Sequence, residues 1–147
     1  MRFRRAFRVD RPAGQVFAYA GDLRNLADWD PAVVASSATT AGPYGVGTEL
    51  LLEAGLLGGR MRLRYRVVAY EPPRLVRMAG GGRRWSSVDT LTVTPTGRGS
   101  EVAYDADVEL RGPLRLAAPL VAVLLAAGGA RALAGLRKAL HALPPSG

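Results

Sequence analysis

The chain of 147 residues contains no cysteine, one histidine and one lysine. The absence of cysteine excludes disulfides, thiolate nucleophiles and zinc sites with cysteine ligands, and it leaves the redox compartment open. The histidine, His141, lies near the end of the chain with no acidic residue at metal-ligand spacing, so we expect its side chain to be exposed. Metal catalysis and a Ser-His-Asp triad are therefore not expected. The sequence predicts neither a metal nor a cofactor.

Basic residues are frequent, but they do not form a run. The formal net charge is +8 and the pI is near 11.0. Many of the arginines alternate with apolar residues, as Arg62, Arg64 and Arg66 do, and this alternation is typical of the solvated face of a strand. We therefore predict no nucleic-acid partner.

The longest uncharged stretch runs from Leu116 to Ala130, about 15 residues. A membrane-spanning helix needs roughly 20, so a buried helix is the favoured interpretation and membrane contact is an alternative. The N-terminus has charged residues inside any apolar segment, which predicts no signal peptide and a cytoplasmic location.

A long helix is predicted from Pro119 to Leu143, because leucines recur there at spacings of three and four residues. We expect Leu120, Leu124 and Ala127, or their neighbours one turn away, to line a cavity or the core. The pair Gly128-Gly129 allows either a close approach of the helix to the sheet, which we favour, or a kink.

Before this helix the pattern is that of strands. Residues 2–10 alternate as a first strand, and two short helices follow, the second over residues 23–29. About six further strands are separated by turn residues, including a glycine-containing loop at Gly55–Gly58. The sequence therefore predicts an α+β fold with about seven antiparallel strands in a single domain, 1–147. The six strands are expected at 33–39, 48–54, 59–70, 75–79, 84–94 and 100–110.

Charges predict the strand register. If the strands at 48–54 and 59–70 form a hairpin whose paired numbers sum to 115, Glu53 faces Arg62 and Glu49 faces Arg66. The last strand carries carboxylates that would lie beside the arginines of the first strand if these two strands pair. Each exposed pair stabilises the fold by only about 0 to 1 kcal/mol, so the pairs inform register more than stability.

Several local motifs follow one another along the chain: Arg11-Pro12-Ala13 with Val16-Phe17, Asp22-Leu23 with Trp29-Asp30-Pro31, Gly45-Val46-Gly47-Thr48, Tyr70-Glu71-Pro72-Pro73, Pro95 with Gly97 and Gly99, and Leu110-Arg111-Gly112-Pro113-Leu114. With these motifs in order, the chain resembles the START-like (SRPBCC) superfamily, and within it the polyketide cyclase/dehydrase group. The resemblance covers nearly the whole chain. It implies a helix-grip fold, in which a curved antiparallel sheet wraps around a long C-terminal helix and a ligand cavity lies between them. Members bind lipids, hormones, quinones or polyketides, and only some are cyclases or aromatases.

Asp89 is the most informative candidate. Alternation on its strand puts it on the inner face, where burial would raise its pKa and suit it to act as a general acid or base. The favoured interpretation is nevertheless that it lies near a strand end or a bulge and reaches solvent or a backbone donor. Tyr65 and Tyr104 either orient a ligand carbonyl or belong to the core. Trp29 matches a family position for an aromatic at the cavity entrance.

The predicted cavity is therefore mainly apolar, with a few polar groups from the inner faces of the strands. Its residues are Trp29, Leu50, Leu52, Met61, Leu63, Tyr65, Trp85, Ser87, Asp89, Tyr104, Leu120 and Leu124.

Three functions are consistent with such a site. The first is binding of a small hydrophobic molecule of polyketide, lipid or isoprenoid type. The second is a polyketide aromatase/cyclase or dehydratase without metal or cofactor, in which Asp89, Tyr65 and Tyr104 transfer protons and stabilise an oxyanion. The third is a membrane-associated lipid-binding module.

Overall fold

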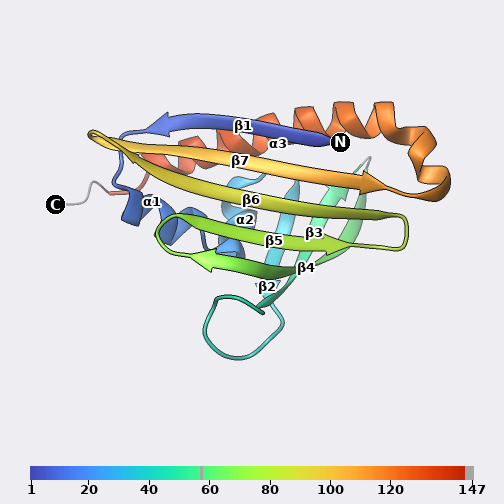
Figure 1. The fold of residues 1–147 in the computed structure, drawn as a ribbon, viewed down its shortest axis with the longest axis horizontal. Coiled ribbons are helices and arrows are strands. Elements are labelled where there is room, and N and C mark those ends of the chain that lie inside the picture. Colours follow the sequence, from blue (N-terminus) through green and yellow to red (C-terminus); the bar gives the residue numbers. More distant parts are fainter. Residues whose placement is uncertain (57, 145–147) are drawn as a thin grey trace.

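One antiparallel sheet organises the chain (Figure 1). In this computed structural model, which describes residues 1–56 and 58–144, seven strands lie in the order β1-β7-β6-β5-β4-β3-β2. The first strand pairs with the last, and β2 lies at the other edge. The strands are β1 (Arg2–Val9), β2 (Val33–Ala38), β3 (Glu49–Leu56), β4 (Gly59–Glu71), β5 (Leu75–Gly81), β6 (Trp85–Thr96) and β7 (Gly99–Leu110).

Short helices follow β1, and one long helix ends the chain. Together with the curved seven-stranded sheet, they confirm the predicted α+β helix-grip fold. The predicted second helix is a 3-10 turn followed by four α-helical residues. The elements are α1 (Ala13–Ala20), η1 (Leu23–Asn25), α2 (Leu26–Trp29), η2 (Gly112–Ala117) and α3 (Ala118–His141).

Two predicted segments fall partly outside the described residues. Leu57 belongs to the predicted loop at Gly55–Gly58, of which Gly55 is placed in β3. Residues 145–147 belong to the predicted domain 1–147.

The predicted register of the β3–β4 hairpin and the predicted pairing of the first strand with the last are both confirmed. Glu53 pairs with Arg62 and Glu49 with Arg66, as the sum of 115 requires. The guanidinium of Arg66 lies 2.8 Å from the Glu49 carboxylate, and that of Arg62 lies 3.6 Å from Glu53. β1 pairs with β7, which brings the first-strand arginines beside the acidic residues of the last strand.

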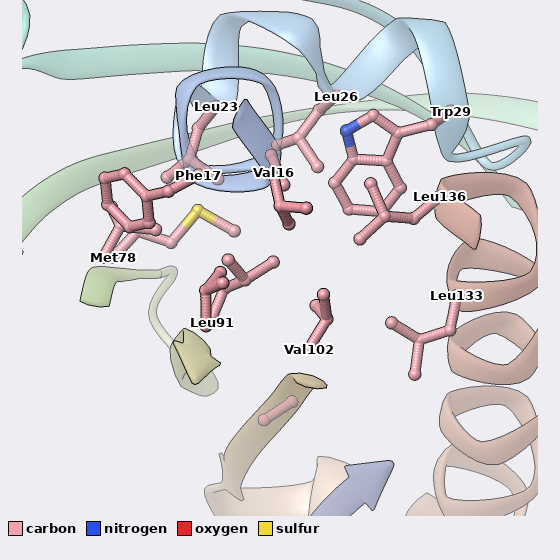
Figure 2. Close-up of a cluster of buried hydrophobic side chains, with 14 of the residues drawn as sticks. Val16, Phe17, Leu23, Leu26, Trp29, Met78, Leu91, Val102, Leu133 and Leu136 are labelled. Atoms are coloured by element: carbon pink, nitrogen blue, oxygen red, sulfur yellow. The ribbon is translucent and has the colours of Figure 1, made fainter. Parts of the chain in front are cut away.

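The core lies where the concave face of the sheet meets α1, α2 and the C-terminal half of α3 (Figure 2). Alternation along the strands supplies inward side chains such as Leu91 and Val102. The stripe predicted on the long helix is confirmed, since Leu133, Leu136 and Leu140 are all buried.

Glycines let α3 approach its neighbours closely. A Cβ atom on Gly129 would lie 2.4 Å from the Phe3 ring, and one on Gly135 would lie 1.9 Å from the Trp29 carbonyl oxygen. Gly128 has no such neighbour within 4 Å. The helix continues through Gly128 and Gly129 without interruption, so the favoured interpretation of close approach is confirmed at Gly129.

The N-terminal half of α3 differs from the prediction. Leu120 is 57% exposed, Ala127 is exposed and Leu124 is half-buried, whereas the sequence predicted that they line the cavity or core. The physical reason is the path of the helix. Its main contacts are with β1, α1 and α2 rather than with β3 to β5, and Figure 1 shows its first turns running on past the start of β1.

The combined helical segment Gly112–His141 is long and apolar enough to cross a membrane by length and composition. Its three buried leucines nevertheless pack in the core. The prediction of a buried helix is therefore confirmed only in the C-terminal part, because the stretch from Leu116 to Ala130 contains no buried residue.

Candidate functional site

Three polar side chains meet on the concave face of the sheet. Ser87 and Asp89 are two residues apart on β6, so they point to the same face. Tyr104 lies on the neighbouring β7, diagonal to Asp89, whose direct partner is Ala106. The Ser87 hydroxyl donates a hydrogen bond to Asp89 Oδ1 at 2.5 Å, and the Tyr104 hydroxyl donates to Oδ2. We call these three residues the polar cluster.

The favoured interpretation of Asp89 from sequence is wrong. Asp89 is neither at a strand end nor at a bulge, because β6 begins four residues earlier and the pairing of β6 with β5 and β7 is regular around it. The side chain is half-buried and accepts hydrogen bonds from two hydroxyl groups of the inner face. The other orientation, toward the cavity side, is therefore the observed one.

The surroundings of the polar cluster disfavour negative charge. Burial raises the pKa of Asp89, although the hydrogen bonds from Ser87 and Tyr104 act in the opposite direction. Burial and the nearby Asp89 carboxylate raise the pKa of Tyr104 well above its ordinary value. The pKa of Tyr65 is raised for the same two reasons. Both tyrosines are therefore neutral hydrogen-bond donors at physiological pH.

A second carboxylate faces the same region. Asp30 ends α2 and is half-buried, and its Oδ1 accepts a hydrogen bond of 2.9 Å from the backbone N–H of Ala32. Burial raises the pKa of Asp30, and the charge of Asp89 raises it further. Sequence reasoning treated Asp30 only as the end of a helix. The one hint in the sequence was that Asp30 directly follows Trp29. Its approach to Asp89 depends on how α2 packs over the sheet, which the local sequence pattern does not determine.

Aromatic side chains flank the polar cluster. The rings of Tyr65 on β4 and Trp85 on β6 have centroids 6.4 Å apart. Tyr65 is buried and Trp85 is half-buried. A hollow of about 220 Å³ at β3 and β4 lies mainly on the opposite, outer face of the sheet, because most of its lining residues alternate with the inward Leu50 and Tyr65: Glu49, Leu51, Arg64, Arg66 and Ala79.

The remaining predicted residues are spread from the core to the rim. Leu50 and Leu52 are buried on β3, and Trp29 lies in the core with Leu133 and Leu136 (Figure 2). Trp29 Nε1 is buried without a hydrogen-bond partner. Leu63 is half-buried.

At the rim, Met61 is 40% exposed. Leu120 and Leu124 lie on the half of α3 that diverges from the sheet. The structure thus brings together Tyr65, Trp85 and the polar cluster, and it leaves Met61 and Leu120 outside the core.

Outside this region, His141 is exposed as predicted. It lines a hollow of about 430 Å³ with Arg8 and Arg137, at the end of the sheet where β6 turns into β7. Across residues 1–56 and 58–144, no group of three or more histidine, aspartate or glutamate side chains could hold a metal ion.

The fold places the protein among helix-grip, START-like proteins. A protein from Thermus thermophilus, TTHA0849, has 20% identity and a TM-score of 0.81, with 97% of this chain and 98% of that chain covered. The Zhui aromatase/cyclase from Streptomyces sp. R1128 has 14% identity and a TM-score of 0.74, with 96% and 93% covered. A START superfamily protein from Mycobacterium smegmatis has 16% identity and a TM-score of 0.72, with 95% and 98% covered.

The chain belongs to the family described as polyketide cyclase / dehydrase and lipid transport, whose model matches residues 1–141. The predicted resemblance is confirmed. No curated protein matches the chain significantly. Membership of this family supports a role in ligand binding or polyketide cyclisation.

The raised pKa of Asp89 gives a prediction about stability. A carboxyl group with a raised folded-state pKa holds more protons in the folded than in the unfolded chain, so stability falls as pH rises from about 4 through that pKa. Asp89→Asn removes this loss. The variant should match the wild type in acid and be the more stable of the two near neutral pH. Urea unfolding across this pH range tests the prediction. It would be contradicted if the free energy of unfolding of the wild type rose relative to that of the variant as the pH increases.

Proposed function

We propose that the protein binds a small hydrophobic molecule of polyketide, lipid or isoprenoid type between the concave face and α3. The observation that carries the proposal is the polar cluster on an otherwise apolar inner surface. A buried carboxylate is costly unless its position is used or fully paired. Family membership gives independent support.

The polar cluster suggests what the ligand carries at one end. A carboxylate accepts a hydrogen bond from a hydroxyl group, and a neutral tyrosine donates one to a carbonyl oxygen. A molecule with a hydroxyl or enol next to a carbonyl would exchange hydrogen bonds with Asp89 and Tyr104. The aromatic rings of Tyr65 and Trp85 would contact its apolar part.

Native mass spectrometry of gently purified protein, followed by organic extraction, tests this proposal. The expected result is a species heavier than the chain that extraction converts to the mass of the chain alone, with the released compound being apolar. Protein that carries no molecule after expression in a polyketide- or isoprenoid-producing host, and that takes up none of that host's extract, would overturn the proposal.

A second candidate function is cyclisation of a poly-β-ketone chain. The observation that favours it is the raised pKa of a carboxyl group in direct hydrogen bond to a tyrosine, because a general base works best when its pKa lies near the operating pH. The Asp89 carboxylate would take a proton from the carbon between two carbonyls, and the enolate would attack a third carbonyl of the same chain. The protonated Asp89 carboxyl would return this proton to the new alkoxide, and loss of water would then form a carbon–carbon double bond in the ring without an oxidant.

A further inference from the structure

An apolar ridge is exposed on η2 and the first half of α3. Leu116 is 88% exposed, Leu120 57% and Val123 64%. Leu120 and Val123 are three residues apart and lie on one side of α3, and Leu116 lies on η2, which leads directly into α3. We call these three residues the apolar ridge. The stretch from Leu116 to Ala130 contains no charge, so no polar side chain interrupts the ridge along the helix.

Arginines lie at the end of the sheet where the helical segment with the apolar ridge begins. The strand registers bring the start of β4, the β5–β6 turn and the end of β7 to one end of the sheet, where η2 and α3 begin (Figure 1). The backbone N–H of Arg111 donates a 2.8 Å hydrogen bond to the carbonyl of Arg84, which ties the turn to the strand end. Five arginines of this end are exposed, and we call them the basic rim: Arg60, Arg83, Arg84, Arg111 and Arg115.

The basic rim has little local compensation. Glu109 is the acidic residue beside it, with its carboxylate 3.9 Å from the Arg111 guanidinium, and both side chains are at least half exposed. An exposed ion pair at that distance neutralises little of the positive charge of the basic rim. The apolar ridge therefore begins beside a positively charged surface.

From this arrangement we infer that this end of the molecule docks on an anionic lipid surface, with the apolar ridge in the headgroup boundary and the basic rim on the phosphates. A helix with apolar side chains on one face and flanking arginines binds such surfaces through both contributions. A symmetric dimer formed through the apolar ridge agrees less well with this distribution of charge. Two copies meeting through the ridge would bring their basic rims together, and the chain already carries a net charge of +8.

Vesicle sedimentation tests the inference without reference to any ligand. Full-length protein is mixed with vesicles of phosphatidylcholine alone, or of phosphatidylcholine and phosphatidylglycerol. We expect binding to the mixed vesicles, weakened by salt, and little binding to the neutral ones. Arg84→Gln/Arg115→Gln should reduce partitioning about tenfold or more, since each basic residue near an anionic surface contributes about 1 kcal/mol. Leu120→Ser/Val123→Ser should reduce it similarly.

Matched controls separate this surface from general charge attraction. Val46→Ser changes an equally exposed valine, 68% exposed, on the β2–β3 connection. Arg98→Gln/Arg137→Gln removes the same charge at the opposite end of the sheet. Both controls should bind as the wild type does. Circular dichroism verifies that each variant is folded.

Three results would overturn the inference. One is the absence of binding to either vesicle, and another is equal loss in the Arg98→Gln/Arg137→Gln control. The third is a dimer in light scattering that Leu120→Ser/Val123→Ser converts to a monomer, without vesicle binding, which would assign the ridge to a second copy. Because these readouts use no bound small molecule, they stand or fall separately from the mass measurement of the proposed ligand.

Discussion

Asp89→Asn is expected to lower the fraction of protein that carries its small molecule, with a loss of affinity of about ten- to a hundredfold. The variant keeps the shape of the side chain but removes the charge-assisted hydrogen bond, which contributes about 1.5 to 3 kcal/mol. If the protein catalyses cyclisation, turnover should fall by about a hundredfold or more, as when a general base is removed. The readout is the bound fraction in native mass spectra, or product formation.

Asp107→Asn is the matched control. Asp107 lies on β7 and is exposed, so the same chemical change should leave the bound fraction unaltered. Tyr104→Phe distinguishes the contribution of the Tyr104 hydroxyl from that of the Asp89 carboxylate. This variant keeps the carboxylate and removes the hydroxyl that donates a hydrogen bond to its Oδ2. An Asp89→Asn variant with the wild-type bound fraction and turnover would exclude the polar cluster from both proposed functions.

Leu136→Ala should destabilise the protein by about 2 to 5 kcal/mol, whereas Leu120→Ala should change stability by less than about 0.5 kcal/mol. Both leucines lie on α3, but Leu136 is fully buried and Leu120 is 57% exposed. Truncation at the buried position removes apolar contacts and leaves a cavity in the core of Figure 2. At the exposed position it removes little.

Urea unfolding followed by tryptophan fluorescence measures this difference, because Trp29 lies in the same core. Comparable losses at the two positions would contradict it. They would mean that the N-terminal half of α3 packs on the sheet in solution.

Local patterns were enough to predict the sheet. Alternation assigns the two faces of a strand, and the pairs Glu53 with Arg62 and Glu49 with Arg66 are compatible with one register of the β3–β4 hairpin. The leucine stripe of α3 predicted its buried face where the helix contacts the core. These features depend on residues near one another in the chain or directly paired across a hairpin.

Features set by tertiary packing were not predictable in the same way. Alternation placed Asp89 on the inner face, but its position away from a strand end or bulge depended on where β6 begins and on regular pairing with two neighbouring strands. The approach of Asp30 to Asp89 depends on the position of α2. The divergence of Leu120 follows from the path of α3 along β1, which the helical pattern does not contain, because an apolar face looks the same whether or not a sheet covers it.

The crystal structure of the protein, gently purified from a host that makes polyketides or isoprenoids, is the most direct test of the central claim. We predict electron density for a small molecule against Asp89 and Tyr104, bounded by the rings of Tyr65 and Trp85. The contradicting result is a structure in which the first half of α3 packs against the concave face, and Leu120 and Leu124 occupy the space predicted for the small molecule.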